Sequence, residues 1–120
     1  MILEAGSKVL VVHRRLFEGD EARYFIGVVN GHESGVAKVS GFSWTRDSLA
    51  GTFVEKNEPR TKIFSITSGT LIVYIIPSNV DLKKIRFETE DNGNSWLADG
   101  SGFKMNLTER GTRHVSARPR

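Results

Sequence analysis

The sequence predicts an all-β protein, a small and strongly bent antiparallel barrel with an added C-terminal β-hairpin and at most one short helical turn. Segments rich in β-branched and aromatic residues recur roughly every eight to fifteen positions, which is typical of sandwiches and barrels. Glycines and turn pairs separate these segments, and no long helical period competes with them. With 120 residues, the chain is long enough for one ordinary domain, expected over 1–109.

Residues 8–46 are expected to form a three-stranded antiparallel meander. Its strands are predicted at 8–18, 23–31 and 36–46, with turns at 19–22 and 32–35. Glycines lie inside these strands at positions 27, 31 and 41. Because a glycine inside a strand permits a bulge or a tight corner, the meander is predicted to bend strongly.

The middle of the chain contributes the remaining barrel strands. A polar break at 47–51 precedes a short strand at 52–56, and Pro59 separates it from strands at 61–67 and 70–76. The last of these is apolar at both alternating sets of positions, so we predict a strand covered on both faces, or one that crosses from one wall of the barrel to another, and the best core segment. Pro77 ends it, and 78–84 is expected to form one helical turn capped by Ser78 or Asn79.

The C-terminal part predicts a hairpin and one further strand. Residues 85–90 alternate, with Ile85, Phe87 and Thr89 expected inward, and Asn92-Gly93 is a type I′ turn signal leading into 95–98. After a turn at 99–102, alternate apolar residues at 103, 105 and 107 share one face.

Charge is distributed unevenly along the chain. Residues 110–120 contain four arginines and no acid, whereas residues 1–109 contain 13 Lys and Arg against 14 Asp and Glu. The folded part is therefore not a basic nucleic-acid surface by composition. The tail lacks an apolar period and is rich in Gly, Arg, Ser and Pro, so it is expected to be disordered.

Motifs of catalysis, metal binding and cofactor binding are not found. The chain has no cysteine, its three histidines have no zinc spacing, and no glycine-rich phosphate loop is present. Glu88, Glu90, Asn92, Gly93 and Asp99 match a calcium-loop spacing, but strands rather than helices flank them, so a solvated hairpin is favoured. We predict no enzyme activity, no cofactor and no metal.

The N-terminal region indicates a cytoplasmic protein. It carries Glu4, has no basic stretch, and its apolar run at 9–12 is too short for a signal core or a membrane span. The absence of cysteine fits a reducing compartment. No membrane partner is expected.

Basic and aromatic residues alternate near the first turn. His13, Arg15 and Phe17 share one side of the expected strand and could stack a base, whereas Arg14 and Arg23 add charge nearby. Alternatively, the aromatic residues are core and the arginines line the rim, where Glu18, Asp20 and Glu21 of the connecting turn counter their charge. The full set of candidate partner or nucleic-acid contacts is His13, Arg14, Arg15, Arg23, Trp44, Trp96, Arg110 and Arg113, the tryptophans being either core or contact residues.

The meander, followed by 62–66 and 70–76, resembles SH3-like and Sm-like small barrels. The segment 24–29, Tyr-Phe-Ile-Gly-Val-Val, is similar to the glycine-centred second strand of Sm-like proteins. The Asp and Asn that follow this strand in the family are not matched, and its N-terminal helix has no counterpart, so no RNA-binding residue is transferred. The resemblance implies a barrel that associates through exposed strand edges.

Three functions are consistent with these features. The first is a binding or assembly module that acts through protein–protein contacts or self-association into a homo-oligomer, because free sheet edges need a partner or a shield. The second is a single-stranded RNA or DNA binder that uses the basic face and the tail. The third is a small-molecule binder or enzyme with a pocket, for which His13, Tyr74 and Glu88 are candidate lining residues.

Overall fold

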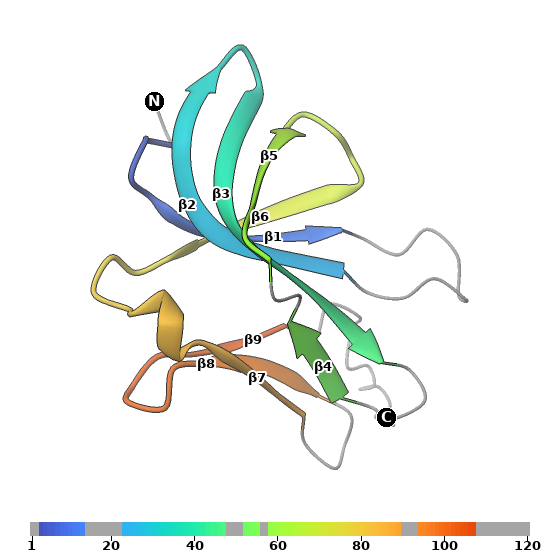
Figure 1. Cartoon of the computed structure of the whole chain (residues 1–120), viewed down its shortest axis with the longest axis vertical. Coiled ribbons are helices and arrows are strands. Elements are labelled where there is room, and N and C mark those ends of the chain that lie inside the picture. The colour runs from blue at the N-terminus through green and yellow to red at the C-terminus, as the bar shows by residue number, and fades with distance from the viewer. Residues whose placement is uncertain (1–2, 14–22, 48–51, 56–57, 90–93, 108–120) are drawn as a thin grey trace, which may run out of the picture. The chain divides into compact units, whose positions relative to one another are not determined.

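The computed structural model is all-β with antiparallel sheets, as predicted (Figure 1). The structure describes residues 3–13, 23–47, 52–55, 58–89 and 94–107. The chain divides into two compact units, Met1–Leu82 and Lys83–Arg120, and each is described by itself. The expected start of a tail at residue 110 lies outside the described residues.

Unit 1 is one antiparallel sheet with the strand order β4-β3-β2-β1-β6, in which β5 also pairs with β3. The strands are β1 (Lys8–His13), β2 (Arg23–Glu33), β3 (Val36–Asp47), β4 (Thr52–Glu55), β5 (Arg60–Ser65) and β6 (Leu71–Ile76). The antiparallel order of the predicted meander is therefore confirmed, whereas the end of its first strand at 14–18 and its turn at 19–22 lie outside the described residues. Its second turn is formed by Ser34 and Gly35, both with positive φ (51° and 79°), as a type I′ hairpin requires.

The sheet bends where β3 changes partner. Residues 36–41 of β3 pair with β5, and residues 44–47 pair with β4. On the other side of β3, Gly41 lies directly opposite Gly27 of β2, and the β2–β3 register shifts between Val29 and Gly31. All three glycines predicted to mark bends thus lie at the close approach or at the bulge (Figure 1).

One face of this sheet buries Leu10, Val12, Ile26 and Ile76, and the other, here called the inner face, carries the main buried cluster of unit 1. The residues of this cluster are Leu3, Val9, Val11, Phe25, Val29, Ala37, Val39 and Phe64. The ring of Phe64 in β5 is 5.5 Å from that of Phe25 in β2 and 6.0 Å from that of His13 in β1. A flat sheet would hold β5 and β1 about 14 Å apart, since they are three strand positions apart. The sheet must therefore curl toward its inner face.

The curl does not close into a barrel within the described part of the chain. β5 pairs only with β3, β6 pairs only with β1, and no ladder joins β5 to β6. The predicted fold class is thus confirmed as all-β and antiparallel, with an open, curled sheet in place of a closed barrel.

The predicted core strand at 70–76 needs correction. β6 is an edge strand in which only Ile76 is buried and Ile75 is 55% exposed. The strand covered on both faces is β1, whose Val9, Leu10, Val11 and Val12 are all buried. The physical reason is position, because β1 lies between β2 and β6 whereas β6 has one neighbour.

Unit 2 is a three-stranded antiparallel sheet in the order β7-β8-β9. Its strands are β7 (Arg86–Thr89), β8 (Ser95–Ala98) and β9 (Lys104–Asn106), and the 3₁₀ turn η1 (Leu82–Lys84) precedes them. The predicted hairpin is confirmed by the β7–β8 pairing, although its turn at 90–93 lies outside the described residues. The helical turn is confirmed only over the last three of its expected residues.

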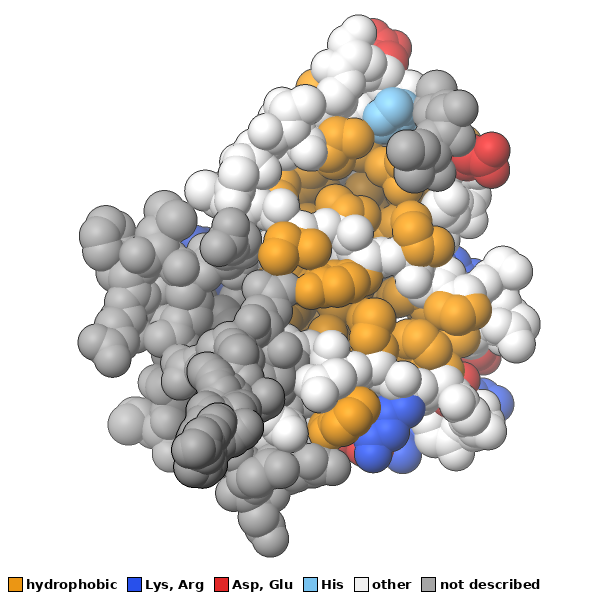
Figure 2. Space-filling model, turned by 180° about the vertical axis from the view of Figure 1, so that it is seen from behind, with side chains coloured by type: hydrophobic (Ala, Val, Ile, Leu, Met, Phe, Trp, Pro, Cys, Tyr) orange, Lys and Arg blue, Asp and Glu red, His pale blue; other side chains and the backbone are white. Residues whose placement is uncertain are grey.

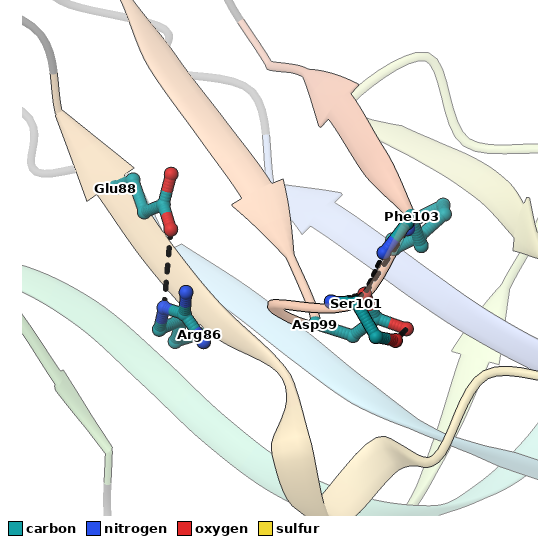
Figure 3. A network of polar contacts seen from close by, with 6 residues as sticks. Arg86, Glu88, Asp99, Ser101 and Phe103 are labelled. Carbon is teal, nitrogen blue, oxygen red and sulfur yellow. Dashed lines mark hydrogen bonds and ion pairs between the residues drawn. The ribbon is translucent and has the colours of Figure 1, made fainter.

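Asp99 organises the turn between β8 and β9 (Figure 3). Its Oδ1 accepts the backbone N–H groups of Ser101, Gly102 and Phe103 at 2.9, 3.2 and 3.0 Å, and its Oδ2 accepts the Ser101 hydroxyl at 3.1 Å. These bonds, the Ser101 N–H foremost, stabilise the charged carboxylate and lower the pKa of Asp99 to about 2. In the same unit, Arg86 Nε donates to Glu88 at 3.0 Å.

Asp99→Asn is expected to change the acid stability of the protein. The lowered pKa means that Asp99 stabilises the fold above its unfolded value of 3.8, and that this contribution is lost as the pH falls toward 2. Chemical denaturation between pH 5 and pH 2 should therefore show a smaller loss of stability in the variant than in the parent. Parallel pH profiles in the two proteins would contradict this account of the turn.

Candidate functional site

The structure describes four of the eight predicted contact residues. His13 and Arg23 are directly opposite each other at the ends of β1 and β2, Trp44 lies in β3, and Trp96 lies in β8 of unit 2. The other four, Arg14, Arg15, Arg110 and Arg113, lie outside the described residues. The structure thus brings together one pair of the predicted set, His13 and Arg23.

A third basic residue joins this pair on the inner face. Lys62 of β5 places its Nζ 5.1 Å from the centre of the Phe25 ring and donates a hydrogen bond to Ser43 Oγ at 3.1 Å. We call His13, Arg23 and Lys62 the basic corner. Phe25 and Phe64 form its buried floor, since they are 1% and 6% exposed and contact each other.

The basic corner changes the protonation of His13. Partial burial of the imidazole is the main cause of its lowered pKa, and the positive charges of Arg23 and Lys62 lower it further. Protonation of His13 is therefore less favourable than protonation of a solvent-exposed histidine. The charged ring would be partly buried, and it would add a third positive charge beside Arg23 and Lys62. Arg23 and Lys62 make the basic corner electropositive even when His13 is neutral.

Sequence reasoning did not single out Lys62 or Phe64. A signal for them existed, because Lys62 and Phe64 alternate within a predicted strand and must share a face. Their meeting with His13 could not be inferred, since it depends on the curl that brings β5 over β1 and β2.

The two tryptophans lie in different units and have different neighbours. Trp44 is half-buried and directly opposite Tyr24, whose ring is 5.7 Å from that of Phe53, on the face away from the core. Trp96 lies under Lys104, whose Nζ is 4.6 Å from the ring centre. The Trp96 Nε1 is buried without a hydrogen-bond partner among the described residues.

The outer edge of β5 is the most exposed apolar feature of unit 1. All its residues except Phe64 are exposed, and Ile63 reaches 70% exposure on the face away from the core. Val36 of the neighbouring β3 is 38% exposed. Figure 2 shows that apolar side chains also reach the surface on the side opposite to the view of Figure 1.

The backbone of β5 also has no partner strand on this edge in the described part of the chain. Successive residues of an antiparallel strand direct their N–H and C=O groups alternately toward one neighbour and the other. Because Ile66 N donates to Gly35 O at 2.8 Å, alternate residues back to Phe64 and Lys62 face β3. Thr61, Ile63 and Ser65 therefore direct their backbone groups away from β3, where no described strand pairs with them.

The predicted pocket of His13, Tyr74 and Glu88 is not assembled within unit 1. His13 pairs with Leu71, so Tyr74, three positions further along β6, points to the opposite face of the sheet. Glu88 belongs to unit 2, where it accepts a hydrogen bond from Arg86. The physical reason is the alternation of side chains along β6.

The described residues contain no group of three or more His, Asp or Glu side chains placed to hold a metal ion. Of the calcium-loop spacing, Glu90, Asn92 and Gly93 lie outside the described residues, and Asp99 already accepts four hydrogen bonds. In the described part, no helix has the length and apolar character to cross a membrane.

The fold and these surfaces define a small all-β protein with a curled sheet, a bare edge and a basic corner. The chain matches no protein-family model, no curated protein and no solved structure. Its function must therefore be argued from its own residues.

Proposed function

We propose that this chain is an assembly module that associates with a second copy of itself through the free edge of β5. This proposal rests on one observation. β5 directs backbone N–H and C=O groups away from β3, and the same strand carries Ile63, which is 70% exposed. An unpaired edge is a template for another strand. When a second strand pairs there, an exposed β-branched side chain becomes buried and adds to the contact area.

The sequence of β5 suits a two-fold pairing. A two-fold axis perpendicular to the strand places identical edges antiparallel and makes the contact self-complementary. Centred at Ile63, it pairs Ile63 with its copy and Thr61 with Ser65 of the second copy. All three residues direct their backbone groups outward, so this register satisfies the bare edge of both chains.

The resemblance to SH3-like and Sm-like barrels supports the same proposal at the level of architecture. The meander of β1, β2 and β3, with β5 beside β3 and β6 beside β1, is the part of the fold on which this resemblance rests. We propose a barrel-like module whose opening between β5 and β6 leaves edges for association.

Ile63→Pro is expected to weaken self-association by about 30-fold. Proline removes the outward N–H, and two-fold symmetry makes this a loss of two hydrogen bonds worth about 1 kcal/mol each. The fold should tolerate it, because this N–H faces away from β3 and proline is accepted on edges. Light scattering and sedimentation equilibrium over a range of concentrations measure the effect.

Ile75→Pro is the matched control on the other edge. Val29 N donates to Ser7 O, so Lys8, Leu10 and Val12 face β6, and Ile75 directs its N–H away from β1. The control should associate like the parent. A parent that remains monomeric at every concentration, or an Ile75→Pro variant that dissociates while Ile63→Pro does not, would overturn the assignment to β5.

A further inference from the structure

The basic corner is a cluster of positive charge that no described carboxylate pairs with. Arg23 is exposed beside His13, and the Lys62 ammonium is held over the Phe25 ring by a hydrogen bond from Nζ to Ser43. Neither Arg23 nor Lys62 forms an ion pair with any carboxylate among the described residues, where the ion pairs are Arg60–Glu58 and Arg86–Glu88. Two fixed cations beside a half-buried imidazole repel one another, and a bound anion would relieve that repulsion.

The chemistry of the corner suits a phosphate oxyanion. The Arg23 guanidinium offers paired N–H donors, the Lys62 ammonium offers a point charge, and the His13 imidazole offers one further donor. Their placement on three strands, β2, β5 and β1, holds the donors on a rigid sheet. In the sequence, the segment 14–22 that joins His13 to Arg23 carries Arg14 and Arg15 but also Glu18, Asp20 and Glu21, so the charge of the corner rests on Arg23 and Lys62.

We propose that the basic corner binds backbone phosphates of single-stranded nucleic acid. A polyanion suits a chain with two cationic groups and an imidazole here and four arginines in its last eleven residues. Phe25 and Phe64 are buried, so bases do not stack on them and the contacts are to phosphates. Phosphate contacts position a strand but do not read its sequence, so binding is expected to be independent of sequence. The proposal does not require the assembly through β5.

The test measures binding of a fluorescent single-stranded oligonucleotide to the full chain by anisotropy, from low to moderate salt. Lys62→Gln and Arg23→Gln should each weaken binding about fivefold at low salt, the upper range for an exposed ion pair. Each should also reduce the slope of log K against log salt by about 0.7, the value for one phosphate contact on a single strand. Binding should raise the His13 pKa, measured from its ring proton shifts by NMR.

Lys38→Gln is the matched control. Lys38 is an exposed lysine of β3 opposite Ile63, on the face away from the basic corner, and its replacement changes the net charge equally. It should bind like the parent. Equal losses in all three variants, no loss in Lys62→Gln and Arg23→Gln, an unmoved His13 pKa, or no binding by the parent would each overturn the proposal. Equal affinity for a duplex of the same length, or for inorganic phosphate alone, would overturn the assignment to single strands.

Discussion

Gly41→Ala is expected to destabilise the protein by about 3 kcal/mol or more, an overpacking effect at the upper end of its usual range. A Cβ at position 41 would lie 2.6 Å from the Gly27 Cα and 2.7 Å from the Ile26 carbonyl carbon. Both are backbone atoms, so no side chain can rotate away, and β2 and β3 would have to separate. Urea denaturation followed by circular dichroism measures the loss.

Gly31→Ala is the matched control for this prediction. Gly31 also lies in β2, but a Cβ there meets nothing within 4 Å and its φ is not in the left-handed region. Alanine should be neutral or slightly stabilising at this position, because it restricts the unfolded chain. Comparable stability of the two variants would contradict the close approach of β2 and β3.

Phe25→Ala is expected to cost about 3–5 kcal/mol, as for other buried aromatic residues. The ring is 1% exposed, packs at 5.5 Å against Phe64, and lies under the Lys62 ammonium. Removing it leaves a cavity on the inner face and takes away the contact that joins β2 to β5. Thermal and urea unfolding should both show the loss, with Phe25→Leu less affected because it leaves a smaller cavity.

Phe42→Ala tests whether this effect belongs to the inner face. Phe42 lies in the neighbouring β3, points to the opposite face and is 37% exposed. Its removal should cost clearly less than that of Phe25, since less apolar area returns to water. If the two substitutions were equally destabilising, the inner face would not be the main core of unit 1.

Phe25→Ala also separates stability from the proposed binding. The variant loses the floor of the basic corner while it keeps His13, Arg23 and Lys62, whereas Lys62→Gln keeps the floor and removes a charge. The proposed phosphate contacts therefore predict a change in salt dependence for Lys62→Gln. The packing of the buried Phe25 ring predicts a change in unfolding for Phe25→Ala.

Local patterns in the sequence determined the class of the protein and most of its strands. Alternation and turn chemistry are local properties, so the meander, the hairpin of unit 2 and the bends at three glycines could be predicted residue by residue. The same reasoning did not make His13 and Arg23 neighbours, because the predicted turn at 19–22 would place His13 opposite Val28, whereas the structure pairs it with Arg23.

Only the tertiary structure decided which strand is central, which edge is bare and which residues meet across the sheet. Apolar residues occupy both faces of β1 and β6 alike, yet β1 is buried and β6 is an edge, because burial depends on neighbours that are distant in sequence. Lys62 reaches Phe25 and Phe64 reaches His13 because the sheet curls through several strands. That curvature is the sum of many small twists and of one close glycine pair, a long-range outcome that no local pattern encodes.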